Sequence, residues 1–173
     1  MDRSSWAVKD QQILTELITL MGVNAEEKAA LAAIKPAAEQ IAPELTKDFY
    51  DRLLAHPNTR EYLEGTNIDR LHSMTDQWFA ELFTGDYDEE YARKRLTIGE
   101  IHVRIGLPVR YPLAMIDLIA KYGEQVAQGA ADPDLTVTAF RKVLALDVVI
   151  KALEGKSPKK IVVVPDRIIN IVV

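Results

Sequence analysis

The chain has 173 residues, 48% of them hydrophobic, which is enough for a single domain with a substantial core. Its formal net charge of −5 comes from interspersed acidic and basic residues, a pattern that disfavours nucleic acid or an anionic membrane surface as a partner. The absence of cysteine excludes disulfides and thiolate metal sites and fits the cytosol, and we expect neither a membrane span nor a signal peptide because charged residues interrupt the apolar runs.

Helical periodicity begins close to the N-terminus. Hydrophobic residues within 4–21 fall on one helical stripe, and Gly22 then offers a C-terminal stop. Asn24 is followed three residues later by Glu27, which is the spacing of a capping box. The pattern predicts one helix that ends before Gly22 and a second that begins after Asn24.

Two prolines divide the next stretch of the sequence. Residues 25–34 are rich in good helix formers, and Pro36 and Pro43 are expected to interrupt the helix or to mark first turns. A further helix is predicted over residues 38–55. It should end at His56, because a residue before proline avoids the helical region.

The remaining pattern is helical almost to the end of the chain. A short helical turn is predicted over residues 57–63, before glycine, aspartate and proline punctuate a series of longer helices. The predicted helices cover residues 67–83, 88–105, 109–129 and 134–154. No strand-like alternation occurs before residue 160, so the sequence predicts an all-α domain.

The C-terminal tail differs from the rest. Residues 156–160 form a polar linker, and the segments 161–164 and 168–173 are rich in β-branched residues that favour strands. We therefore expect a helical domain over residues 1–155 and a linker with a strand-prone tail over 156–173. The tail can be interpreted as the start of a truncated output domain, as an isolated strand pair, or as an artefactual extension.

One histidine stands out among the three in the chain. Ile98, Ile101, His102 and Ile105 recur at i, i+3, i+4 and i+7, which places them on one face of a helix. A neutral imidazole on such an apolar face must satisfy its ring nitrogens or bind a ligand. Two interpretations stay open at this point, a hydrogen-bonded core histidine and an axial ligand of haem iron.

Several other chemistries are disfavoured by the motifs. No HExxH or ExxH pair shares a helical face, so a zinc or di-iron site is not expected. There is no glycine-rich phosphate loop, no G-x-S-x-G elbow and no cysteine nucleophile.

A haem site needs fewer specific residues than these sites, because one axial ligand and an apolar slot between helices are enough. Tyr50 is either a hydrogen-bond donor in that slot or a core residue with its hydroxyl at the rim. The apolar side chains that can line such a slot include Phe49, Leu53, Leu71, Trp78, Leu82, Ile98 and Ile105.

Three segments together resemble a known family. The run 48–50 (Asp-Phe-Tyr), the stretch from Leu71 to Trp78 and the run 101–108 (IHVRIGLP) are similar to the sensor globins of bacterial globin-coupled sensors. The resemblance covers about residues 5–155 and leaves out the tail. It implies a globin fold of the 3-over-3 type, with an extra N-terminal helix and a reduced D region.

The resemblance also implies roles for individual residues around haem b. His102 corresponds to the proximal iron ligand and Tyr50 to the distal donor toward dioxygen. The other positions are Leu71 and Thr75 facing the gas pocket, Phe49 and Trp78 in its wall, and Tyr111 near the proximal side. His72 lies about 100° from Leu71 around the helix, so we expect it at the rim or surface.

The expected function is that of a haem-based gas sensor domain that binds dioxygen (O2), carbon monoxide or nitric oxide. By resemblance, the domain is expected to be a homodimer through its last two helices and not itself an enzyme. One alternative is a haem-free globin-fold module of the stressosome type. The other is a haem redox enzyme such as a nitric oxide dioxygenase.

Overall fold

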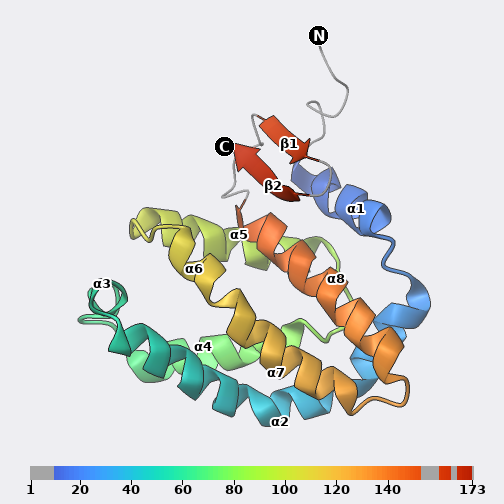
Figure 1. Cartoon of the computed structure of the whole chain (residues 1–173), viewed down its shortest axis with the longest axis horizontal. Helices are drawn as coiled ribbons and strands as arrows, with labels where there is room; N and C mark the ends of the chain where they lie inside the picture. The colour runs from blue at the N-terminus through green and yellow to red at the C-terminus, as the bar shows by residue number, and fades with distance from the viewer. Residues whose placement is uncertain (1–9, 153–159, 165–166, 173) are drawn as a thin grey trace.

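The structure, a computed structural model, describes residues 10–152, 160–164 and 167–172 (Figure 1). Over residues 10–152 every regular element is an α-helix, which confirms the predicted all-α class. The helices are α1 (Asp10–Met21), α2 (Ala25–Ala55), α3 (Pro57–Arg60), α4 (Ile68–Glu81), α5 (Glu89–Arg104), α6 (Arg110–Ala114), α7 (Ile116–Gln128) and α8 (Pro133–Ala152). Within the described part of the chain, no helix is both long and apolar enough to cross a bilayer.

The second helix begins at the predicted capping box. The Asn24 side chain accepts a hydrogen bond from the Glu27 backbone N–H at 2.9 Å, and Glu27 Oε2 accepts one from the Asn24 backbone N–H at 3.0 Å. These two bonds satisfy backbone donors that a helix start leaves without partners. A separate helix, α1, precedes it, whereas the predicted start of that helix at residue 4 lies outside the described residues.

The expected interruption of this helix is wrong. Pro36 and Pro43 both lie inside α2, which runs unbroken for 31 residues. Each proline removes one helical hydrogen bond, the one that residue 32 or residue 39 would accept. Ala32 and Glu39 are exposed, as are both prolines, so water can take the place of the missing donor. The penalty is therefore small enough for the packing of α2 to outweigh it.

The predicted helix over residues 109–129 is instead two helices, α6 and α7, which meet at Met115. The backbone N–H of Met115 donates to the Pro112 carbonyl three residues earlier, at 3.2 Å, and this tighter bond breaks the regular helical pattern. The helices predicted over residues 67–83 and 88–105 are confirmed, with ends that differ by one or two residues from the expected ones. The turn predicted over residues 57–63 is helical over Pro57–Arg60. The helix predicted over 134–154 is confirmed from Pro133, and its expected end lies outside the described residues.

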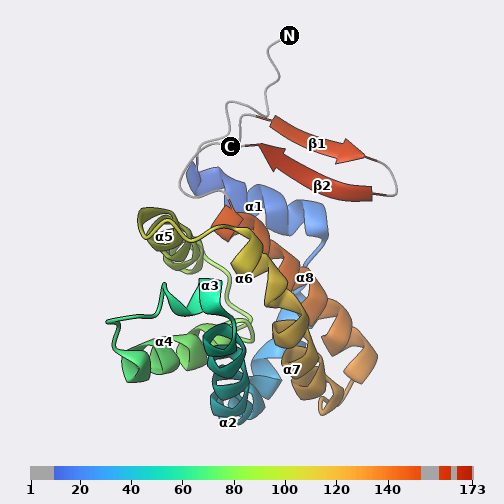
Figure 2. The same ribbon diagram turned by 60° about the vertical axis from the view of Figure 1, so that its left-hand side comes forward.

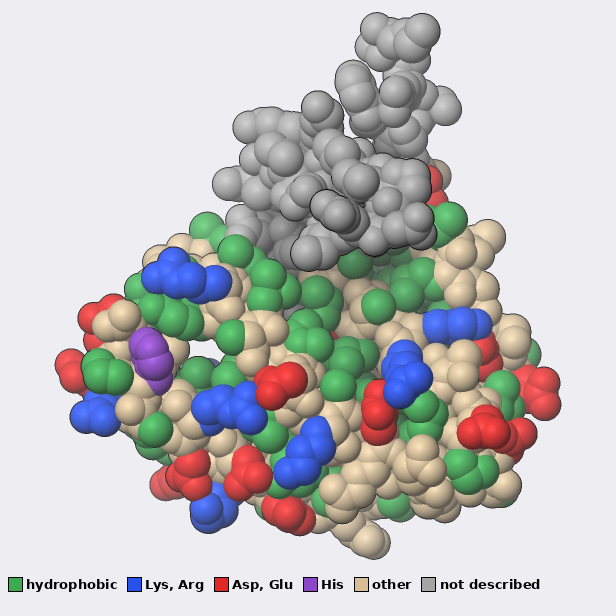
Figure 3. Space-filling model, in the orientation of Figure 1, with side chains coloured by type: hydrophobic (Ala, Val, Ile, Leu, Met, Phe, Trp, Pro, Cys, Tyr) green, Lys and Arg blue, Asp and Glu red, His purple; other side chains and the backbone are tan. Residues whose placement is uncertain are grey.

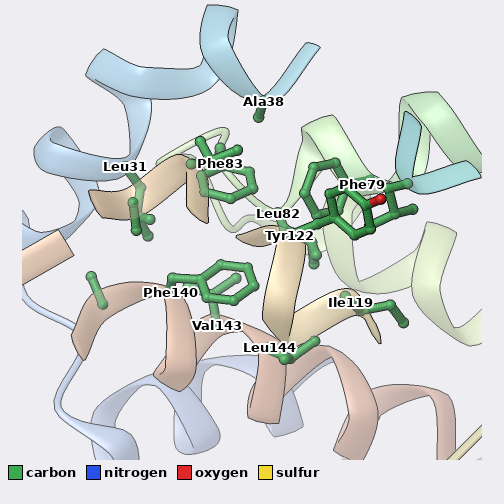
Figure 4. Close-up of a cluster of buried hydrophobic side chains, with 14 of the residues drawn as sticks. Leu31, Ala38, Phe79, Leu82, Phe83, Ile119, Tyr122, Phe140, Val143 and Leu144 are labelled. Carbon is green, nitrogen blue, oxygen red and sulfur yellow. The ribbon is translucent and has the colours of Figure 1, made fainter. Parts of the chain in front are cut away.

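The helices enclose one hydrophobic core. The helix α2 packs along α4, while α7 and α8 lie side by side against α2, and α5 packs against α8 (Figures 1 and 2). At the centre, the Phe83 and Phe140 rings stack with centroids 5.2 Å apart, and Phe79 meets Phe83 edge-on (Figure 4). On the face formed by α6, α7 and α8, acidic and basic side chains are interspersed (Figure 3).

The helices α7 and α8 are in tight contact at a glycine. A Cβ atom at Gly123 would lie 1.9 Å from the Phe140 ring, so any side chain there would collide with the core. Gly123 therefore allows the Phe140 ring to lie directly against the backbone of α7.

The tail has the strand character that its sequence predicts. Strands β1 (Lys160–Val164) and β2 (Arg167–Val172) pair antiparallel, with Ile161 opposite Ile171. The predicted boundary between residues 155 and 156 lies outside the described residues.

Candidate functional site

His102 faces an apolar cavity near the end of α5. The cavity has a volume of about 70 Å³, and Gly99, one turn before His102, is buried in its wall. Side chains from four other elements complete the lining, including Trp78, Leu107, Pro112, Ile116, Ile119 and Leu144. Asp147 of α8 is the carboxylate in this otherwise apolar wall. The histidine is half-buried, so the helix directs it inward as the sequence predicts.

The sequence after His102 fixes the end of α5. Gly106 has a φ of 71°, and its N–H donates to the Val103 carbonyl at 2.9 Å. The N–H of Leu107 donates to the carbonyl of His102 itself, also at 2.9 Å. This pair of bonds is a Schellman motif, which needs glycine at the left-handed position. It anchors the backbone of His102 and turns Leu107 back into the cavity wall.

A second cluster of polar side chains lies between α2 and α4. The Tyr50 hydroxyl is 3.2 Å from the Thr75 hydroxyl, and Tyr50 is buried. Burial raises the pKa of Tyr50, the charge of Asp76 adds to that rise, and the hydrogen bond with Thr75 offsets part of it. The Tyr50 hydroxyl therefore stays protonated at neutral pH and can act as a hydrogen-bond donor.

His72 belongs to this cluster, contrary to the expected position at the rim. Its ring centroid lies 4.6 Å from that of Tyr50, and its Nε2 atom is buried with no hydrogen-bond partner among the described residues. The face that α4 turns toward α2 includes Thr75 and the fully buried Phe79, at i+3 and i+7 from His72. The expectation failed because it took Leu71 as the centre of that face.

A more open groove separates α4 from α5. Its volume is about 320 Å³, and its lining includes Trp78 and Ile98 together with the basic side chains of Arg93 and Lys94. Trp78 lines both this groove and the cavity of His102. Trp78 is therefore shared by the groove and the cavity.

The remaining predicted pocket residues lie in several different places. Phe49 meets the Tyr50 ring edge-on at 5.4 Å, and Leu53 packs against the core; both side chains, like Leu71, are half-buried. Ile105 is 49% exposed. Tyr111 lies beside His56 and Tyr62 at ring separations of 6.2 and 6.3 Å. Of the predicted pocket residues, the lining of this cavity includes His102 and Trp78. The others lie outside it, namely Phe49, Tyr50, Leu53, Leu71, Thr75, Ile98, Ile105 and Tyr111.

Sequence reasoning missed two buried charges beside the cavity. The Arg95 and Asp147 side chains are each 1% exposed, with Arg95 Nε 2.6 Å from Asp147 Oδ1. A signal was present, because Tyr91, Arg95 and Gly99 recur every four residues along the buried stripe of α5. A charged residue on such a stripe has to find a partner inside the protein.

Comparisons with known proteins agree with this architecture. The protoglobin family model matches residues 10–153. The heme-based aerotactic transducer HemAT of Halobacterium salinarum is 28% identical over 159 residues, which cover 80% of this chain and 32% of that protein. The globin domain of the Geobacter sulfurreducens globin-coupled sensor superposes with a TM-score of 0.76 and 27% identity, covering 82% of this chain and 97% of that one.

The matches to longer proteins cover only part of those proteins. The chain spans about a third of the length of HemAT. A leucine–tRNA ligase of Sinorhizobium medicae is 71% identical over 31 residues, which make up 18% of this chain and 4% of that enzyme, too little to indicate its activity here. The family match spans nearly all of the helical domain and agrees with the superposition. The chain therefore has the all-α globin fold and belongs to the protoglobin family, as the resemblance to sensor globins predicts.

Proposed function

We propose that this chain is a haem-based gas-sensor domain in which His102 is the axial ligand of the iron and Tyr50 is the distal hydrogen-bond donor. The observation that carries the proposal is the direction of His102, which faces an apolar cavity near the end of a helix anchored by a Schellman motif. The similarity to a heme-based aerotactic transducer and to the globin domain of a globin-coupled sensor supports it.

The residues present fit haem as a ligand. A haem site needs a ligand for the iron, such as an imidazole, within an apolar slot, and the walls around His102 are almost entirely apolar. The buried Nε2 of His72 is a polar atom without a described partner, as expected where a bound molecule completes a pocket. Haem, when bound, supplies an iron atom with a coordination position open to dioxygen, carbon monoxide or nitric oxide.

The side chains of this domain would bind the iron, exclude water and stabilise the bound gas. His102 would hold the iron through a ring nitrogen, while Leu107 and Ile116 keep water from that side. The Tyr50 hydroxyl would donate a hydrogen bond to the gas, and Thr75 would hold that hydroxyl in place. Such a bond favours dioxygen over carbon monoxide, because dioxygen develops more negative charge. A net gain of about 1 kcal/mol corresponds to roughly a five-fold slower release.

The proposed pocket is smaller than the sequence suggests. It keeps Phe49, Leu53, Leu71, Trp78 and Ile98 as wall residues from α2, α4 and α5. Ile105 and Tyr111 are left out because of their positions at the surface and beside His56. We further propose that α7 and α8 form the contact of a homodimer, through which the binding of gas is communicated.

Absorption spectroscopy tests this proposal directly. The protein expressed with a haem precursor should be red, and its Soret band should move when carbon monoxide is added to the reduced form. His102→Ala should lose the haem, whereas His56→Ala, at an exposed histidine, should retain it. A colourless wild-type protein would favour the haem-free alternative, and full haem occupancy in His102→Ala would place the ligand elsewhere.

A further inference from the structure

A buried ion pair joins α5 to α8 beside the cavity of His102. Arg95 and Asp147 are almost completely withdrawn from solvent, and their charged atoms are 2.6 Å apart. Burial of two charges costs several kcal/mol per ion before their attraction is counted. Apolar side chains of similar size would serve packing alone equally well, so this pair calls for another role.

The Arg95 guanidinium is held from several sides. Its Nη1 donates to Glu81 Oε2 at 2.7 Å, its Nη2 donates to the Trp78 carbonyl at 3.4 Å, and its Cζ lies 4.3 Å from the centroid of the Tyr91 ring. These contacts come from α4 and α5, so they hold the guanidinium in place independently of Asp147 on α8. The cluster thus presents a rigid cation to the Asp147 carboxylate.

Asp147 faces the same cavity as His102. Both side chains line it, together with Trp78, whose Nε1 donates to Asp147 Oδ1 at 3.2 Å. Arg95 lies seven residues before His102, and so on the same face of α5. The carboxylate is therefore held by the Trp78 N–H and by the charge of Arg95 at the wall toward which the histidine is directed.

We propose that Asp147 is a positioning residue for His102, whose carboxylate accepts a hydrogen bond from the imidazole N–H that does not face the iron. The inference rests on the proposed function, in which His102 holds haem. Histidines that bind metals commonly donate their second N–H to a carboxylate, which fixes the ring and strengthens it as a ligand. Because Asp147 belongs to α8, the same contact links the ligand on α5 to a second helix.

Resonance Raman spectroscopy of the reduced, ligand-free holoprotein measures the relevant property, the iron–histidine stretching frequency. Asp147→Asn removes the negative charge and should lower this frequency, and haem should be lost roughly 10- to 100-fold faster. Asp134→Asn, at an exposed aspartate in the first turn of the same helix, is the matched control and should change neither quantity.

A second variant separates positioning from simple support of the fold. Trp78→Phe removes a donor that competes for the Asp147 carboxylate, so the carboxylate should bind the imidazole N–H more strongly and the frequency should rise. Opposite shifts in Trp78→Phe and Asp147→Asn support the proposal, because a loss of packing would move both in one direction. If Asp147→Asn does not fold because Arg95 loses one of its two carboxylate partners, a raised frequency in Trp78→Phe still supports the proposal.

The contrary results are distinct from a failure of the proposed function. An unchanged frequency in Asp147→Asn with haem retained, equal shifts in both variants, or an unchanged or lowered frequency in Trp78→Phe would overturn the role of Asp147. A wild-type protein without haem, or with haem bound independently of His102, would instead overturn the proposed function.

Discussion

The ring of His72 lies 4.6 Å from the ring of Tyr50, and its Nε2 atom is buried with no hydrogen-bond partner among the described residues. A buried polar atom left in this state costs about 1–3 kcal/mol. The face between α2 and α4 thus holds an imidazole nitrogen that has no partner among the described residues beside the proposed gas-binding hydroxyl. Such a cost is typical of a site that is completed by something it binds.

Replacing His72 by leucine should stabilise the haem-free protein. The substitution removes the unpartnered nitrogen and keeps a side chain of similar size, so the free energy of unfolding should rise by roughly 1 kcal/mol. Urea denaturation of the two haem-free proteins measures the difference. His56→Leu, at an exposed position, should change it by less than about 0.5 kcal/mol. A loss of stability in His72→Leu would show that the imidazole makes favourable contacts.

Replacing Tyr50 by phenylalanine should weaken the retention of dioxygen. The change removes the hydroxyl that Thr75 holds and leaves the ring in place, so dioxygen should dissociate roughly five-fold faster. Carbon monoxide, which accepts a weaker hydrogen bond, should respond much less. Stopped-flow measurements give both rates. Tyr111→Phe is the control, since its hydroxyl accepts from Arg110 away from the cavity; equal dioxygen rates in wild type and Tyr50→Phe would refute the role of Tyr50.

The fold should depend strongly on one carboxylate at the start of α2. Glu27 is buried, closes the capping box, and accepts a hydrogen bond from Lys142 Nζ of α8 at 2.6 Å. Glu27→Gln should lower the free energy of unfolding by about 2 kcal/mol, because the charged partner loses its counterion.

The exposed pair on the same helix provides a comparison for this effect. Glu39 lies 3.5 Å from Lys35, and both side chains are well exposed. Glu39→Gln should therefore change stability by less than about 0.5 kcal/mol. Urea denaturation of both variants tests the contrast, and equal losses would contradict a special role for Glu27.

Glu81 should contribute to the loss of stability in acid. Burial raises the pKa of its carboxyl, but the hydrogen bonds and charges of Arg95 and Lys94 lower it more, so the pKa lies below its ordinary value in the folded protein. A carboxyl whose pKa is lowered by folding stabilises the fold at pH values above its ordinary pKa of about 4.3. This contribution is lost as the pH falls through the pKa of the folded protein.

The stability gap between wild type and Glu81→Gln should consequently narrow as the pH falls from about 5 to about 3. Urea denaturation at a series of pH values measures that gap. Glu90→Gln serves as the control, because Glu90 lies at the surface and 3.6 Å from Lys94. A gap for Glu81→Gln that stays constant over this range would contradict the prediction.

Much of the fold could be predicted because its signals are local. Caps such as Asn24 and Asp88 and the positive-φ Gly106 mark helix ends wherever the chain is folded. The unbroken course of α2 through its two prolines could not be predicted, for the opposite reason. Their local penalty of about 3 kcal/mol each is offset by packing between segments that are distant in sequence, and periodicity does not report that packing.

The site was less predictable because burial depends on neighbours. The inward direction of His102 follows from its apolar stripe, whereas the contact of His72 with Tyr50 depends on how α4 rotates against α2. Arg95 and Asp147 look like ordinary surface charges until α5 and α8 are brought together. Sequence patterns therefore identify a single residue on an apolar face more readily than a polar cluster assembled across helices.

Gly123 has a mechanical consequence for any signal that leaves the domain. Because the Phe140 ring rests against the backbone at this glycine, α7 and α8 cannot slide along each other without dislodging the ring from the core. A displacement of one helix would consequently move the other with it. Whatever reads the state of this domain would sense a tilt of the whole pair.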